Sequence, residues 1–302
     1  MLWIPITVAA AFFQNLRSAL QRQLKSELSD LGAASVRFLY ALPFALVWLA
    51  IVTYLSGSSL PVVNSDFAAW VVGGAAAQII FTFLLMWLFS FSNFTVGTAL
   101  SKTEVVQVIL LEALLLHESV SGRGLVAILI AFVGVMIMTL GRNQLSLRAL
   151  FSGLVEKATL IGLACGFALG LSAVFFRGAA LSLEDSGMLM RSAFTLAVAT
   201  AIQTLILLVW LRVFQPGQIR RTIGQWQRCT LVGFAGWAAS IFWFMAFTLT
   251  HAAYVRALGQ IELIFTFLAS VFFFRERVTR TEVIGVILLS GAIVLLVLEK
   301  AA

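Results

Sequence analysis

Charged residues are scarce in this chain of 302 residues. Only 11% of its residues are charged and 61% are hydrophobic, with a mean hydropathy of +1.04. An ordinary soluble domain has roughly 25% charged and about 45–50% apolar residues. Too few polar side chains are present to cover a water-exposed surface, so a soluble globular fold is excluded. The composition predicts a protein that lies mainly in a lipid bilayer.

The residues of common catalytic and metal sites are also few. The two cysteines, Cys165 and Cys229, have no CxxC spacing, and the two histidines, His117 and His251, lie at the edges of apolar runs. No HExxH, GxSxG or Walker sequence occurs. The sequence therefore predicts no metal, no cofactor, no enzymatic activity and no direct use of ATP.

Ten apolar runs have the length of a membrane span and are separated by polar or Gly/Pro-containing segments. They are long and continuous, which predicts helices and excludes the strands of a β-barrel. The expected fold is an all-α integral membrane protein of about ten transmembrane helices, located in the inner (plasma) membrane. The runs cover residues 2–20, 31–54, 68–89, 96–116, 120–140, 160–181, 189–213, 230–250, 252–274 and 283–298.

An internal repeat divides the chain into halves of five helices each. Residues 92–121 align without gaps with residues 250–279, pairing Glu104 with Glu262 and Glu118 with Glu276. The predicted repeats are residues 1–141 and 158–302, joined by a loop at 142–157. Because each repeat has an odd number of spans, the two copies should cross the membrane in opposite directions.

The net charge of +7 comes from Lys and Arg residues in short loops, which does not indicate a nucleic-acid partner. Most of these residues follow predicted helices 1, 5, 7 and 9, whereas the opposite side holds Arg123 and Lys300. Basic loops usually lie in the cytoplasm, so this distribution predicts that both termini are outside.

Several segments resemble the EamA-type carriers of the drug/metabolite transporter superfamily. These are VRFLYALPFAL at Arg37, HESVS at Glu118 and RERVT at Glu276, the last two each followed by a Gly-containing span. The resemblance implies a ten-helix, two-repeat carrier with both termini in the cytoplasm, so it disagrees with the loop charges and leaves the orientation open. The sequence departs from the family at SKTEVVQ, which lacks a proline often found there.

Charged residues within spans are costly, so they are candidates for function. Glu104 and Glu262 are expected near the middle of the membrane, facing each other across a central cavity and binding substrate and proton in exchange. The alternative is that each forms a structural ion pair with a nearby Arg or Lys. Glu112, which has no acidic partner in the repeat, is a weaker candidate.

Other polar and aromatic residues could complete such a site. Lys102 is two residues from Glu104 and should face a different neighbour. Arg256 and Gln260 lie one turn apart and form a polar stripe that serves either function or helix packing. Trp237 and Trp243 either line the substrate cavity or face lipid.

Two further groups of residues have alternative interpretations. Arg37 and Arg191, each near the start of the second helix of its half, either extend to the lipid headgroups or act in transport. Gly162, Gly166 and Gly170 recur at every fourth position, which is typical of close helix packing.

These features together predict a secondary active transporter. We expect export of a small polar or amphipathic metabolite, such as an amino acid or a drug-like compound, coupled to protons by alternating access. The expected partners are this small-molecule substrate, protons and the lipid bilayer, and the protein should be a monomer or a homodimer. The alternatives are a channel or a non-transporting membrane sensor, with an intramembrane enzyme least favoured.

Overall fold

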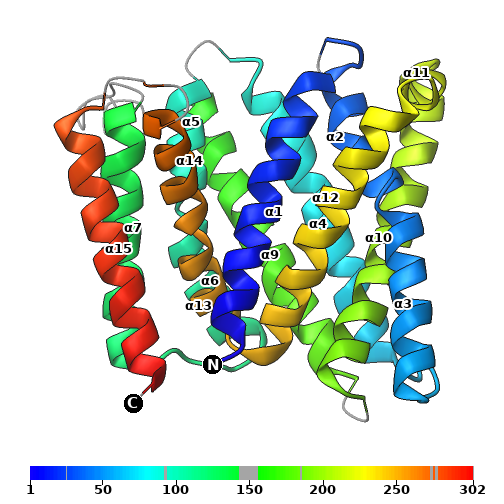
Figure 1. Cartoon of the computed structure of the whole chain (residues 1–302), viewed down its shortest axis with the longest axis horizontal. Helices are drawn as coiled ribbons and strands as arrows, with labels where there is room; N and C mark the ends of the chain where they lie inside the picture. The colour runs from blue at the N-terminus through cyan, green and yellow to red at the C-terminus, as the bar shows by residue number, and fades with distance from the viewer. Residues whose placement is uncertain are drawn as a thin grey trace. The chain divides into compact units, whose positions relative to one another are not determined.

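The computed structural model describes residues 1–24, 26–91, 94–142, 156–183, 186–272, 275 and 278–301. All regular structure in these residues is helical (Figure 1). The described part of the chain has eight helices or joined helix pairs that are long and apolar enough to span a membrane. The helical membrane fold expected from the composition is therefore confirmed, while the number of ten spans stays a prediction.

The helices follow the predicted apolar runs closely, and three of those runs are divided into shorter helices. The helices are α1 Trp3–Leu24, α2 Asp30–Leu39, α3 Leu42–Ser56, α4 Ser65–Leu88, α5 Phe94–Ser101, α6 Glu104–Leu115, α7 Gly122–Arg142, α9 Lys157–Leu181, α10 Met188–Phe214, α11 Gln218–Gly224, α12 Trp226–Leu249, α13 Ala252–Gly259, α14 Ile261–Phe272 and α15 Arg280–Ala301.

Two runs account for the difference between eight and ten. Helix α1 has 22 residues but is not among the eight spanning candidates. Helices α5 and α6 are short, with 8 and 12 residues, and the segment that they form carries Lys102, Glu104 and Glu112. Such charges lower the mean hydropathy by which a membrane span is recognised.

The chain folds into two compact units, and each contains segments from both halves of the sequence. The first unit comprises residues 1–4, 80–174 and 250–302, and the second comprises residues 5–79 and 175–249. The two sequence repeats and the two compact units therefore divide the chain at different places. The repeat boundaries 1–141 and 158–302 stay predictions, and residues 143–155 of the joining loop lie outside the described residues.

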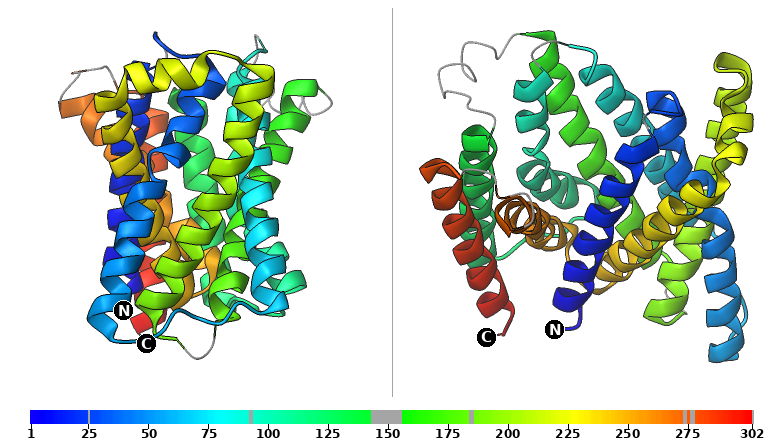
Figure 2. Two further views of the ribbon diagram at one scale, coloured as in Figure 1. Left: turned by 90° about the vertical axis from the view of Figure 1, so that its right-hand side faces the viewer. Right: turned by 45° about the horizontal axis from the view of Figure 1, so that its top comes forward.

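In the first unit, α7 and α15 run side by side (Figures 1 and 2). Glycines permit this approach from both sides. A Cβ at Gly134 would lie 2.8 Å from the backbone nitrogen of Leu289, and one at Gly285 would lie 2.6 Å from the backbone nitrogen of Met138. Ala131, Val135, Leu289 and Ala292 form a buried apolar cluster along this contact.

In the second unit, α10 packs against α2, α3 and α12. Helices α2 and α3 form one span interrupted at Tyr40 and Ala41. Pro43 occupies the first turn of α3, where its missing N–H group is tolerated but a continuous helix is not. A Cβ at Gly233 of α12 would collide with the backbone of Tyr40, so α12 passes directly beside this interruption.

The helix interruptions in the first unit agree with the sequence repeat. In the alignment of 92–121 with 250–279, the bounds of α5 coincide with those of α13, and α6 and α14 coincide to within one residue. Both helix pairs are interrupted immediately before the matched glutamates. The repeat therefore preserves a broken helix as well as a pair of carboxylates.

Candidate functional site

The two interruptions bring charged side chains together within the first unit. Glu104 lies in the first turn of α6, and Glu262 lies in the first turn of α14. The N-terminus of a helix carries a partial positive charge, which favours a carboxylate there. Lys102 follows α5 directly, while Arg256 lies in α13 and Gln260 caps the C-terminus of that helix.

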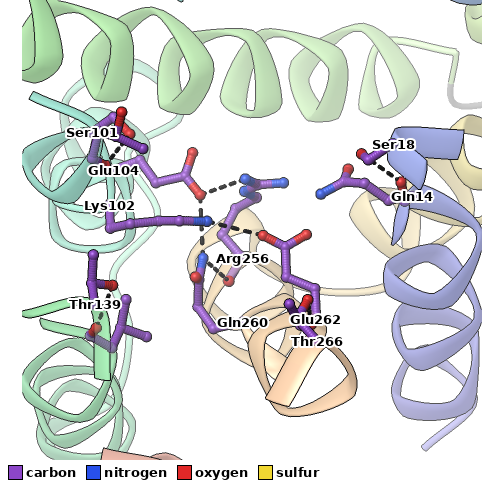
Figure 3. Close-up of polar contacts among 12 residues, drawn as sticks. Gln14, Ser18, Ser101, Lys102, Glu104, Thr139, Arg256, Gln260, Glu262 and Thr266 are labelled. Carbon is purple, nitrogen blue, oxygen red and sulfur yellow. Dashed lines mark hydrogen bonds and ion pairs between the residues drawn. The ribbon is translucent and has the colours of Figure 1, made fainter. Parts of the chain in front are cut away.

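Glu104 forms a buried ion pair with Arg256 (Figure 3). The Glu104 Oε1 atom accepts from Nη2 of Arg256, and it also accepts from Nε2 of Gln260 at 3.3 Å. The side chains of Glu104 and Arg256 are only 2% and 9% exposed. Two opposite charges removed from water to this extent stabilise each other only while both are present.

Lys102 forms the second ion pair, with Glu262 (Figure 3). The Lys102 Nζ atom donates to Oε1 of Glu262 at 3.0 Å. These two side chains are 23% and 15% exposed, so this pair is more accessible than the first. Lys102 and Glu104, although two residues apart, therefore have different partners. Lys102 lies in the interruption between α5 and α6, so the helical spacing used in the sequence analysis does not apply to this pair.

Each ion pair joins one repeat to the other. Glu104 and Lys102 come from the first half of the sequence, and their partners Arg256 and Glu262 come from the second. The two carboxylates were expected to face each other across a cavity. Each of them points to a cation of the opposite repeat, as in the ion-pair alternative of the sequence analysis. An adjacent opposite charge compensates a buried carboxylate better than an open space does. Arg256 and Gln260 both donate to Glu104, whereas the sequence predicted only that these two residues form one polar stripe.

A face of α9 packs against this site through glycines. A Cβ at Gly162 would collide with the backbone of Gly97, and one at Gly166 would lie 2.7 Å from the carbonyl oxygen of Ser101 and 3.2 Å from the nitrogen of Glu104. At Gly170 the nearest atom would be Cγ2 of Val108, at 2.9 Å. The close packing predicted for this stripe is confirmed, and it holds α9 against α5 and the start of α6.

Glu112 has a structural role that the sequence did not indicate. Its Oε1 and Oε2 atoms accept from the backbone nitrogens of Ala252 and Ala253, at 2.7 and 3.1 Å. N–H groups in the first turn of a helix have no acceptor within the helix, so the buried carboxylate of Glu112 caps α13. This contact joins the end of α6 to the helix that carries Arg256.

His251 lies between two carboxylates at the same place. Its Nδ1 atom is 3.6 Å from Oε1 of Glu112 and 3.3 Å from Oε2 of Glu118. One ligand atom from each residue lies within 4.8 Å of the others, so the three are suitable in kind for a divalent cation. Since Glu112 already accepts from two backbone N–H groups, the helix cap accounts for its position without a metal. Glu276, the repeat counterpart of Glu118, lies outside the described residues.

The two tryptophans proposed for a substrate cavity lie in the second unit. Trp243 is buried, and its Nε1 donates to Oε1 of Gln14 at 3.0 Å. Trp237 packs among aromatic rings of α3 and α12, with Phe44, Trp48 and Phe234 at 5.5–6.1 Å between ring centroids. Neither ring is among the residues that line the small cavity of this unit.

The arginines near the starts of the second helices differ in their surroundings. The Nε atom of Arg191 donates to the carbonyl oxygen of Ser186 at 2.6 Å, which fixes the start of α10. Arg37 lines a small cavity of the second unit together with Arg17. No signal in the sequence paired Arg37 with Arg17, because the two come from different helices and have no repeat relationship to each other.

A family model for EamA-like transporters matches residues 1–140 and 156–298, which together are nearly the whole chain. This chain belongs to the EamA-like transporter family. The resemblance noted from the sequence is confirmed, and the two matched segments agree with a two-repeat architecture of the drug/metabolite transporter superfamily. Members of this family are membrane transporters, which supports the assignment of this protein as a transporter and as a non-enzyme.

The fold is also similar to that of a solved structure. A chain titled "Crystal structure of protein" is 13% identical, with a TM-score of 0.69, and the match covers 98% of this chain and 97% of that one. At this identity the similarity shows the fold alone. No curated protein matches the sequence.

Proposed function

We propose that this EamA-like protein is a secondary active transporter that exports a small polar or amphipathic metabolite in exchange for protons. The observation that carries the proposal is the pair of ion pairs, Glu104–Arg256 and Lys102–Glu262, which lie at matched helix interruptions and connect the two repeats. Interrupted helices near the membrane centre are a recurrent means of building substrate and ion sites in carriers.

Proton binding at Glu104 would alter the contact between α6 and α13. A proton on the carboxylate removes the negative charge that compensates Arg256, and an uncompensated cation at a buried position is costly. The protonated state therefore favours an arrangement in which Arg256 moves to water or to a substrate anion. In this way proton binding and separation of the two helices become one event.

Glu262 and Lys102 supply a second, more accessible pair of the same kind. Because both pairs connect the repeats, any movement of one repeat relative to the other must break or rearrange them. Alternating access in proteins with inverted repeats proceeds by such movement. We therefore propose Glu104, Glu262, Lys102, Arg256 and Gln260 as the residues that couple protons to transport.

The test uses purified protein in liposomes that contain the pH-sensitive dye pyranine. A panel of amino acids and of amphipathic amines is added in turn, and the substrate-dependent movement of protons is recorded. For a substrate that the wild-type protein carries, Glu104→Gln and Glu262→Gln should each abolish the coupled proton movement, because neither amide can bind a proton at this position.

A matched control is Glu27→Gln, since Glu27 is an exposed carboxylate in the segment between α1 and α2. This variant should transport like the wild type. If Glu104→Gln and Glu262→Gln both transport at the full rate with unchanged pH dependence, the proposed role of these carboxylates is wrong.

A further inference from the structure

The short helix α11 of the second unit lies between the ends of two apolar spans. The span formed by α10 ends at Phe214, and the span formed by α12 begins at Trp226. Between them, Pro216 and Gly217, the latter with a φ of 91°, turn the chain into α11. Figure 2 shows α11 crossing from the end of α10 to the start of α12. Because both spans end here, α11 lies at the level of the lipid headgroups.

The charge on and beside α11 is predominantly positive. Four exposed arginines, here called the α11 arginines, lie on this helix and on the adjoining ends of α10 and α12: Arg212, Arg220, Arg221 and Arg228. The sequence has no acidic residue between positions 186 and 261. Helix α2 packs beside α11, and Glu27 and Asp30 lie near its start. With four arginines near two carboxylates, the excess charge of this surface is positive.

Hydrogen bonds hold α11 in place against α2. The backbone nitrogen of Ser29 donates to Oε1 of Gln218 at 3.2 Å, and the hydroxyl group of Tyr40 donates to the carbonyl oxygen of Thr222 at 2.9 Å. Thr222 is only 1% exposed, so one side of this helix is buried. The exposed arginines therefore lie on a fixed surface.

Large apolar side chains are exposed on the same surface. Phe214, Ile223 and Trp226 are 62%, 61% and 58% exposed. Helices that lie in a membrane interface combine basic side chains with Trp, Phe or Leu, which enter the boundary between headgroups and acyl chains. Tryptophan is itself enriched at this level of the membrane. The surface therefore offers cations to a headgroup and apolar contact to the acyl chains of the same molecule.

We propose that the α11 arginines bind the headgroups of anionic phospholipids. A guanidinium group matches the oxygens of a phosphodiester through charge-assisted hydrogen bonds. A basic side chain close to an anionic lipid surface strengthens binding by about fivefold. A soluble anion would use only the charges, whereas a lipid also covers the exposed Phe214, Ile223 and Trp226. This proposal does not depend on the transport function.

The test is a lipid titration of the purified protein in detergent, followed by native mass spectrometry. The probes are phosphatidylglycerol and phosphatidylcholine with identical acyl chains. Both contain the phosphodiester, but the choline group of the second lipid neutralises its charge. We expect the wild-type protein to bind phosphatidylglycerol at least about tenfold more tightly, and sodium chloride should reduce this preference.

Variants then locate the binding surface. The double variant Arg220→Gln, Arg221→Gln should weaken the binding of phosphatidylglycerol by about 25-fold, because two contributions of about fivefold are lost. Arg123→Gln, which removes an exposed arginine from α7 of the first unit, should bind this lipid like the wild type. All three side chains are exposed, so the variants should fold, and their melting temperatures without added lipid check this.

Equal affinity of the wild-type protein for the two lipids overturns the proposal. Unchanged binding of phosphatidylglycerol by the double variant also overturns it, and so does an equal loss in Arg123→Gln. Inorganic phosphate is then added as a competitor. If it displaces phosphatidylglycerol at a concentration similar to that of the lipid, the surface is a site for soluble anions and the assignment to lipid is wrong.

Discussion

The buried ion pair Glu104–Arg256 makes a quantitative prediction about stability. The perturbations are Glu104→Gln, Arg256→Met and the combination of both. The two side chains are 2% and 9% exposed, so removing one charge leaves the other uncompensated in a region with little water. Breaking a buried pair in this way typically costs about 3–5 kcal/mol. We expect each single variant to lose stability of this order.

The double variant distinguishes pairing from separate effects. With both charges removed, no uncompensated ion remains, so its loss should be at least about 2 kcal/mol smaller than the sum of the two single losses. The same cycle on Lys102 and Glu262 provides an internal comparison. Those side chains are 23% and 15% exposed, so we expect a smaller coupling of about 1 kcal/mol.

The assay is unfolding in mixed detergent micelles, followed by tryptophan fluorescence, with the free energy of unfolding compared among the variants. If the losses for Glu104→Gln and Arg256→Met add to within about 0.5 kcal/mol in the double variant, the two charges are not coupled. That result would refute the ion pair as the contact between the repeats.

Two further predictions concern packing and capping in the first unit. Gly162→Ala should destabilise the protein by about 1–3 kcal/mol because the new Cβ meets the backbone of Gly97. Gly291→Ala, whose Cβ would have nothing within 4 Å, should change stability by less than about 1 kcal/mol. The free energies of unfolding of the two variants check this prediction, and equal losses would contradict it. Glu112→Ala should lower the free energy of unfolding by about 1–3 kcal/mol because the backbone N–H groups of Ala252 and Ala253 lose their acceptor. Its melting temperature should be lower than that of the matched variant Glu118→Ala. Equal melting temperatures would show that the helix cap does not contribute to stability.

The sequence predicted the elements that depend on local patterns. Apolar length predicted the helices, and the spacing of small residues predicted the close approach of α9 at Gly162 and Gly166. The ungapped alignment predicted that the regions of Glu104 and Glu262 are equivalent, and the shared helix interruptions agree with this. These features follow from periodicity and composition, which are visible in one sequence.

The interruptions themselves and most of the contacts were not predicted. The run at 96–116 is apolar on both sides of Lys102, so hydropathy treats it as one span, and the run at 31–54 was treated in the same way despite Pro43. The partner of each carboxylate also depends on how helices from distant parts of the chain pack. Periodicity does not give that packing, so Glu104–Arg256, the cap by Glu112 and the meeting of Arg17 with Arg37 appear only in the structure.

The most direct test of the transport account is the dependence of efflux on a pH gradient. Liposomes containing the purified protein are loaded with a substrate identified by comparing the metabolites that cells export with and without the protein. Efflux should accelerate when protons are more concentrated outside, and a protonophore should abolish the acceleration. Efflux that is independent of the pH gradient, or single-channel currents across a bilayer containing the protein, would contradict a proton-coupled carrier.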